Sequence, residues 1–317
     1  MKRSLLLALT GAVLAAAPLG AQSAATGKPK RINKAIELLE QGQPIYYTHG
    51  SGGFEDGKKL AQTYADYINY EMEHGAFDMT ALREFMRGLV AGGPTKSGHR
   101  SPAVIATLPI LGLDEAGMRA NYWVVQQVLA CGVHGILLCH ARSPEAIRVM
   151  IEASRYTFAE RAAGLGEGFR GSGSQGFASQ IWGISADEYL KKADPWPLNK
   201  NGEILMGLKI EDKHALANAE KSAKVPGIGF AEWGPGDMGF SLVGIPSEGF
   251  GERPFPPVLQ QARARIFKAV KDAKIYFLNG CSEKDVEEMI KEGVMICSSG
   301  QAAAEKGRKF SKRPTPW

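Results

Sequence analysis

Short apolar runs alternate with longer amphipathic segments along most of this chain. The apolar runs predict eight strands, and segments with helical spacing separate them. The predicted strands cover 43–49, 67–74, 103–108, 135–140, 207–211, 228–232, 274–279 and 294–298. A further amphipathic helix, predicted over 31–41, precedes the first strand. Strands and helices that alternate in this way, with no linker between them, predict an α/β fold of the (β/α)₈ type, a TIM barrel with an N-terminal helix.

The predicted helices are less regular than the strands. They cover 58–65, 79–90, 115–130, 143–155, 187–192, the segment after Glu211, and then 257–272, 282–292 and 301–306, with Gly307 ending the last one. The stretch from 156 to 184 is rich in Gly, Ser and Ala, and a loop of this length is usually functional or a lid. A doubly wound open sheet is the alternative, but the turn after the first strand lacks the Gly-x-Gly-x-x-Gly spacing of dinucleotide-binding folds.

Two acids, Glu211 and Asp237, follow the ends of neighbouring predicted strands. The carboxyl ends of barrel strands gather at one face, where the loops carry the chemistry. Two carboxylates held in this way are typical ligands of one divalent metal ion with open positions for an oxygen-rich substrate. The same residues also suit structural roles, since Glu211 could cap the next helix and Asp237 could close the turn that begins at Trp233. The sequence leaves both interpretations open.

Three histidines stand at the ends of three different predicted strands. A single histidine in such a position is usually structural, but the barrel brings all three to the face that carries the acids, and imidazoles there offer acid–base groups near neutral pH. The residues expected to converge are His49, His74, His140, Glu211, Glu232 and Asp237. The other three histidines, His99, His134 and His214, are predicted to lie away from this face.

Four segments between about Ala65 and Ser299 resemble the HpcH/HpaI aldolase family, which includes the 2-dehydro-3-deoxyglucarate and 4-hydroxy-2-oxoheptanedioate aldolases. They are 70–75, then 143–146 together with 154–156 and 169–174, then 208–212, and finally 234–241. The resemblance implies a TIM barrel of the phosphoenolpyruvate/pyruvate-superfamily type, in which Glu211 and Asp237 hold a divalent ion. It implies Mg²⁺ or Mn²⁺, with Co²⁺ or Zn²⁺ as alternatives, and an acid–base role for His74.

The resemblance also implies contacts to a small-molecule substrate and a way of assembling. Arg170 and Gly171 are expected to lie in a loop that covers the site, and Gly236, His49 and Trp233 are expected to bind substrate. Relatives are commonly hexamers, so a homo-oligomer, trimer or hexamer, is expected.

The chain departs from the family pattern at several positions. The family's substrate-binding Arg falls near Thr107–Pro109, where this chain has no Arg, and the acid that supports the family's catalytic His falls at Ala130. Lys209 replaces a family Gln; it could supply the lost positive charge or, with a lowered pKa, act as a base or an imine-forming amine. His140 replaces an apolar residue and could contact metal or substrate. These departures favour a substrate other than pyruvate.

Composition and charge add a location and exclude one class of partner. The basic start at Lys2 and Arg3, the apolar run 5–17 and the small residues that follow predict a secretory signal peptide over 1–25, cleaved after Ala21 or Ala25, with a single barrel domain over 26–317. The run is too short for a stable membrane anchor. We therefore expect a periplasmic or secreted protein. The net charge of +5 is too small to indicate a nucleic-acid partner, and four cysteines in apolar surroundings favour buried free thiols over a disulfide framework.

These observations predict an exported, divalent-metal-dependent carbon–carbon lyase acting on a 2-oxo or hydroxy acid or a related chelating substrate. The aromatic residues of the expected lid favour a larger or aromatic substrate. Two alternatives stay open. The barrel could carry a metal-dependent hydrolase or isomerase instead, or an exported binding protein that has lost turnover.

Overall fold

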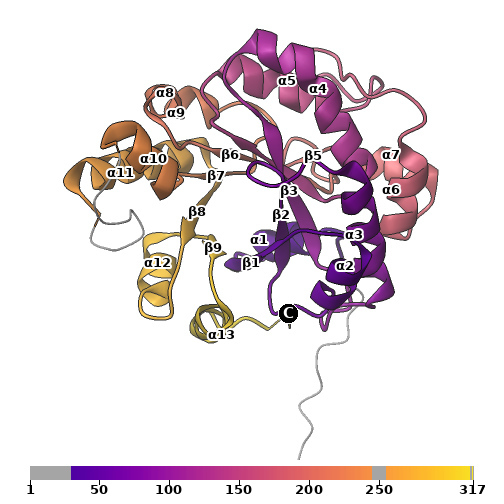
Figure 1. The fold of residues 1–317 in the computed structure, drawn as a ribbon, viewed down its shortest axis with the longest axis horizontal. Helices are drawn as coiled ribbons and strands as arrows, with labels where there is room; N and C mark the ends of the chain where they lie inside the picture. Colours follow the sequence, from indigo (N-terminus) through magenta and orange to yellow (C-terminus); the bar gives the residue numbers. More distant parts are fainter. Residues whose placement is uncertain (1–29, 245–254, 315, 317) are drawn as a thin grey trace, which may run out of the picture.

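The structure is a computed structural model that describes residues 30–244, 255–314 and 316 (Figure 1). The predicted signal peptide, 1–25, lies outside the described residues. Within them, no helix combines the length and the apolar character that crossing a membrane requires.

Eight parallel strands close into a barrel, which confirms the predicted TIM-barrel fold. Each strand pairs with its neighbour in chain order, and the two contacts that close the ring are β1 with β9 and β4 with β6. The barrel strands are β1 (Ile45–Gly50), β2 (Tyr67–Glu71), β3 (Ala103–Leu111), β4 (Gly135–Cys139), β6 (Ile204–Lys209), β7 (Phe230–Glu232), β8 (Tyr276–Gly280) and β9 (Ile296–Ser298). The two-residue strand β5 (Pro195–Trp196) pairs only with the start of β6.

Most helices lie around the outside of the barrel in the connections between strands, with one helix before the first strand and one after the last (Figure 1). They are α1 (Lys34–Glu40), α2 (Phe54–Leu60), α3 (Met79–Ala91), α4 (Glu115–Ala130), α5 (Pro144–Ser154), α6 (Gln175–Trp182), α7 (Ala186–Lys192), α8 (Lys213–Ala217), α9 (Ala219–Ser222), α10 (Pro235–Leu242), α11 (Pro257–Ala273), α12 (Val286–Glu292) and α13 (Gln301–Phe310).

The first helix closes the end of the barrel where the strands begin. Asn33 caps α1 through its side-chain oxygen, and its side-chain amide donates to the carbonyl oxygens of His134 and Glu203 beside the starts of β4 and β6. The apolar face of α1 packs with the inward-facing side chains of the strands in one buried cluster. With this end filled, the barrel opens only at the strand ends.

Some helix predictions were wrong in their limits. The helix predicted over 58–65 instead covers Phe54–Leu60, and its earlier start is stabilised by Asp56, whose carboxylate accepts a hydrogen bond from the Gly53 N–H. The predicted turn at 233–237 is the start of α10, with Pro235 at its first position. The long segment 156–184 contains α6, and the last helix continues past Gly307 to Phe310, because the small Gly307 packs against the ring of Tyr46.

Candidate metal centre

The polar residues of the site form the last layer of the barrel interior. Below that layer, inward side chains such as Tyr67, Leu137 and Phe230 are apolar and buried. Side chains two positions apart along a strand point to the same side, so the residues two positions after this apolar layer also face the barrel interior. At that level the interior becomes polar or ionisable, with His49, Asn69, Thr107, Cys139, Lys209, Glu232 and Ser298.

Glu73 is the most connected acid at the mouth of the barrel. One carboxylate oxygen accepts hydrogen bonds from the Cys139 thiol and the Lys209 ammonium, both at 2.8 Å. The rings of two histidines lie close, with Nε2 of His74 at 3.6 Å and Nε2 of His140 at 3.7 Å from its oxygens. Burial would raise the pKa of Glu73, but its bonds to Cys139 and Lys209 outweigh burial and lower it, so this carboxylate is ionised.

Lys209 supplies a fixed positive charge to the site. Burial by itself would lower its pKa, but the surrounding groups Cys139, Glu211, Glu232 and Glu73 raise it well above its usual range. Its Nζ lies 2.8 Å from Glu73 and 3.7 Å from Glu211. The idea that Lys209 has a lowered pKa and acts as a base or imine-forming amine was therefore wrong, because the acids around it stabilise the ammonium form.

Glu211 is buried and oriented by backbone features. One carboxylate oxygen accepts a hydrogen bond of 3.0 Å from the backbone N–H of His140. His140 has a φ of +45°, an uncommon conformation for a residue other than Gly, Asn or Asp, and strain of this kind gathers at functional sites. On the other side, Gly234 has a φ of +47°, and a Cβ there would come within 2.6 Å of the Glu211 side chain. Any other residue at 234 would displace this carboxylate.

Glu211 does not cap the helix that follows it, because the neighbouring Asp212 has that role. Asp212 is the residue that caps α8, since one of its oxygens accepts from the backbone N–H groups of His214 and Ala215. Glu211 instead faces the barrel mouth. Asp237 lies in the first turn of α10, directly after β7, and so it approaches the same mouth from the neighbouring strand.

His140 is held by a hydrogen bond to Asp212. Its Nδ1 lies 2.8 Å from the second oxygen of Asp212, which also accepts a hydrogen bond of 2.8 Å from Nε of Arg142. This bond to Asp212 raises the pKa of His140 above its usual range, although burial opposes the shift. With Nδ1 engaged, Nε2 is the nitrogen that faces the acids.

Among the residues that the structure describes, two groups of side chains have donor atoms close enough to hold a metal ion. One consists of His140, Glu211 and Asp237, and the other of Glu73, Cys139 and Glu211; in each, the donor atoms lie within 4.8 Å of one another. Ligands about 2.0–2.2 Å from a cation lie about 3–4 Å apart, so small side-chain movements would bring either group into contact with one ion.

The balance of charge also fits a cation. Burial raises the pKa of Glu211, and the nearby Glu232 and Glu73 add to this despite the opposing effect of Lys209. Burial likewise raises the pKa of Glu232, whose Oε2 is buried and has no hydrogen-bond partner among the described residues. The acids at the mouth thus exceed the cations that neutralise them, and a divalent ion would relieve the imbalance.

His49 and His74 line a cavity of about 530 Å³, and the His74 ring connects it to Glu73. Its wall also includes Glu71, Asp56 and Lys59. The His74 side chain is 68 % exposed, so it can reach solvent and a ligand. The structure therefore gathers the predicted residues His49, His74, Lys209, His140, Glu211 and Asp237 at one end of the barrel.

Other predicted site residues do not lie where the sequence analysis expected them. Arg170 is buried, and it donates to Ser154 and Tyr189 near the far ends of α5 and α4. It and Gly171 thus lie on the opposite side from the strand ends and do not cover the site within one chain. Trp233 is buried and donates to Asn279, so packing fixes it. By contrast, Gly236 lies where it was expected, exposed in the first turn of α10 next to Asp237.

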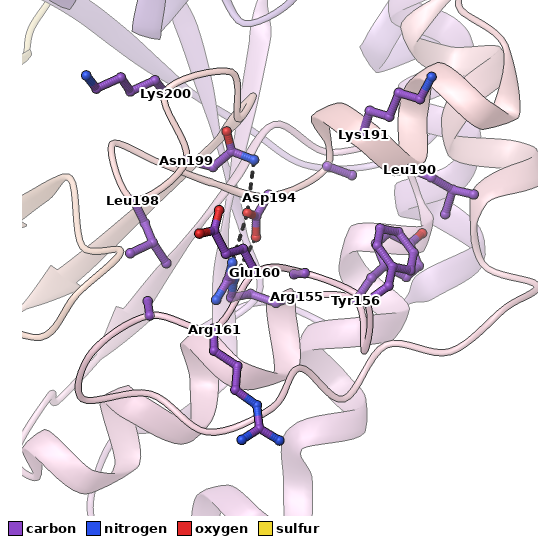
Figure 2. Close-up of a pocket in the computed structure, with 14 residues that line it drawn as sticks. Arg155, Tyr156, Glu160, Arg161, Leu190, Lys191, Asp194, Leu198, Asn199 and Lys200 are labelled. Carbon is purple, nitrogen blue, oxygen red and sulfur yellow. Dashed lines mark hydrogen bonds and ion pairs between the residues drawn. The ribbon is translucent and has the colours of Figure 1, made fainter.

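Figure 2 shows a different cavity, of about 500 Å³, in which Arg155 and Asn199 both bond to Asp194. It lies where α5 ends and β5 begins, at the end of the barrel that stabilises the fold. Its central charges already form a buried ion pair. We therefore assign the chemistry to the mouth of the barrel instead.

Sequence reasoning missed Glu73, Cys139 and Asp212 as site residues. Glu73 lies just past the end of β2, where strand alternation no longer fixes its direction. Cys139 could have been found, because it occupies an inward position at the end of β4. Asp212 is adjacent to Glu211, and only its cap geometry separates their roles.

Comparison with known sequences gives a partial match. No family model matches the chain. A hydroxypyruvate/pyruvate aldolase of Deinococcus radiodurans is 29% identical over 119 residues, which cover 38% of this chain and 37% of that protein. The chain thus matches little more than a third of the length of this curated relative.

The solved structures that the chain resembles cover most of it. An HpcH/HpaI aldolase/citrate lyase family protein from Burkholderia cenocepacia J2315 has a TM-score of 0.64 at 18% identity, over 88% of this chain and 96% of that one. An HpcH/HpaI aldolase from Desulfitobacterium hafniense DCB-2 has a TM-score of 0.59 at 18% identity, again over 88% and 96%. At identities this low, the structural likeness establishes the fold and nothing finer. The predicted resemblance to the HpcH/HpaI aldolases is confirmed, and this sequence diverges widely from those relatives.

Proposed function

We propose that this chain is a divergent HpcH/HpaI-type enzyme, a divalent-metal-dependent carbon–carbon lyase acting on a 2-oxo or hydroxy acid. One observation carries the proposal. Glu211 and Asp237 follow adjacent strands of the barrel, and their oxygens lie within 4.8 Å of each other and of a His140 nitrogen. The aldolase match and the aldolase fold support the reaction class.

The residues present fit a divalent ion such as Mg²⁺ or Mn²⁺. Glu211 and Asp237 would hold it, since both present carboxylate oxygens where the charge balance favours a cation. The ion supplies Lewis-acid polarisation of a carbonyl oxygen, which eases the breaking of the neighbouring carbon–carbon bond.

The protein's own groups supply binding and proton transfer. His74 is exposed in the cavity beside the acids and lies close to Glu73, so it is the group that exchanges a proton with the substrate. Lys209 carries a permanent positive charge beside Glu73 and Glu211. It limits the repulsion among the acids and attracts the carboxylate of an incoming acid.

The residues around the candidate metal centre limit which substrate it can bind. The chain has no Arg at Thr107 and Leu108 in the second half of β3, so it has no bidentate clamp there for a carboxylate. We infer that the substrate is not pyruvate. It differs from pyruvate in the chemical group that the protein binds across the site from the metal. From the sequence we also propose that the mature protein is exported. From the resemblance we propose that it forms a homo-oligomer, which size-exclusion chromatography with light scattering tests.

The test is a screen of 2-oxo and hydroxy acids, including aromatic ones, for aldol cleavage with Mg²⁺ or Mn²⁺. We expect turnover that a chelator abolishes and that Glu211→Ala and Asp237→Ala remove, while Glu145→Ala, at an exposed carboxylate of α5, keeps it. Bound metal with ligand binding but no cleavage would indicate the exported binding protein. Hydrolysis or isomerisation of a screened acid would indicate the other alternative.

A further inference from the structure

His140 has the geometry of a metal ligand. Its Nδ1 lies 2.8 Å from an Asp212 oxygen, while its Nε2 lies 3.7 Å from an oxygen of Glu73 at the barrel mouth. Metal-binding histidines in proteins almost always donate their second nitrogen to a carboxylate or carbonyl in this way, which fixes the ring and its tautomer. The Asp212 oxygen is itself held by Arg142, while the other Asp212 oxygen caps α8.

The backbone at residue 140 contributes to the same arrangement. Because His140 adopts a left-handed conformation, its N–H points to Glu211 while its ring lies in the same group of donors as Glu211 and Asp237. One residue thus orients one carboxylate and places a nitrogen beside it. A strained backbone at such a point is retained when the surrounding structure requires it.

We propose that His140 is a third ligand of the cation held by Glu211 and Asp237, and that the centre therefore prefers Mn²⁺, Co²⁺ or Zn²⁺ to Mg²⁺. The inference rests on the proposed function for the existence of a metal centre. It goes beyond that function by naming a nitrogen ligand, which Mg²⁺ accepts poorly and later transition ions accept well.

The test measures metal binding by the full mature protein after it has been stripped with a chelator. Titration calorimetry with Mn²⁺, Zn²⁺ and Mg²⁺ gives affinities, and pulsed EPR of the Mn²⁺-loaded protein detects a coordinated nitrogen. The variant is His140→Asn, because Asn tolerates the left-handed backbone and its side chain is too short to reach the position of Nε2. The matched control is His214→Asn, at an exposed histidine of α8.

We expect the wild-type protein to bind Mn²⁺ and Zn²⁺ more tightly than Mg²⁺ and to show nitrogen coupling. His140→Asn should remove the coupling and weaken Zn²⁺ binding at least about tenfold, and Asp212→Asn should weaken it by about 10–100-fold. His214→Asn should change neither quantity. A merely structural role for His140 would not remove a nitrogen coupling.

Two results would overturn the inference, and they differ in what else they reject. If the wild-type protein binds metal in a manner that depends on Glu211 and Asp237 but lacks nitrogen coupling, His140 is not a ligand and the proposed function stands. If the wild-type protein binds no divalent ion at all, both the inference and the proposed metal-dependent function fail.

Discussion

Replacing Lys209 by Met tests the electrostatics of the site, because Met keeps most of the length of the side chain and removes its charge. The Lys209 ammonium lies 2.8 Å from Glu73 and 3.7 Å from Glu211. At an effective dielectric constant of about 20 these distances correspond to attractions of about 6 and 4.5 kcal/mol. The cost of burying the lysine offsets much of this sum.

Removing one partner of a buried ion pair typically costs about 3–5 kcal/mol, because the remaining charge is left uncompensated. We therefore expect Lys209→Met to lower the free energy of unfolding by about 3–5 kcal/mol at pH 7 in the presence of a chelator. The measurement is chemical denaturation followed by circular dichroism. Adding Mn²⁺ should recover part of the loss, since the ion then takes over the neutralisation of Glu211.

The controls separate this effect from a general loss of packing. Lys268→Met, at a fully exposed lysine of α11, should leave the denaturation midpoint unchanged. Combining Lys209→Met with Glu73→Gln should cost less than the sum of the two single changes, because the charge exposed by one is removed by the other. The reasoning is refuted if metal-free Lys209→Met is as stable as the wild-type protein or if the two changes are additive.

Three further predictions concern groups elsewhere in the fold. Burial lowers the pKa of His134 to about 3, against about 6.5 in the unfolded chain, so the folded protein holds this histidine neutral. The free energy of unfolding should therefore be full above pH 6.5 and fall by about 2 kcal/mol between pH 7 and pH 5. His134→Gln should flatten that part of a stability–pH curve. Asp66 is fully buried between Arg308 and Arg313, so Asp66→Asn should lower the free energy of unfolding by about 3–5 kcal/mol in chemical denaturation; an unchanged midpoint would contradict this. The Cys139 thiol is buried and its pKa is raised, so thiol titration should leave it unreacted in the folded protein, and labelling of Cys139 without unfolding would refute its burial.

The fold and the meeting of Glu211 with Asp237 at one face could be predicted because they depend on local patterns. Strand alternation reveals which runs enter a barrel, and the barrel fixes that Glu211 and Asp237 meet at one face. The same rule predicted that His49, His74 and His140 lie at one end of the barrel, where the structure places His49 in β1 and the other two just after β2 and β4. These predictions need only the order of elements along the chain.

The hydrogen-bond network could not be predicted because it joins residues far apart in sequence. The Lys209–Glu73 bond spans 136 positions, the Cys139–Glu73 bond 66 and the His140–Asp212 bond 72. No periodicity shows which of two neighbouring acids turns inward after a strand ends. For the same reason the sequence left two roles open for Lys209, a positive charge or an amine with a lowered pKa, because the direction of its pKa shift depends on acids that only the folded barrel assembles.

Arg170 shows the converse error, in which a motif was assigned a place that the topology does not give it. The resemblance associated its segment with the site, whereas α5 carries the chain back to the far end of the barrel before Arg170 is reached. A residue of the right type in a familiar motif still takes its position from the helix that precedes it.

The most direct test of the central claim is an anomalous-difference map from crystals of the mature protein soaked in Mn²⁺. The account predicts one strong peak at the barrel mouth within coordination distance of both Glu211 and Asp237, with the His140 ring adjacent. A peak held by Glu73 and Cys139 without Asp237, or no peak at the barrel mouth, would contradict it.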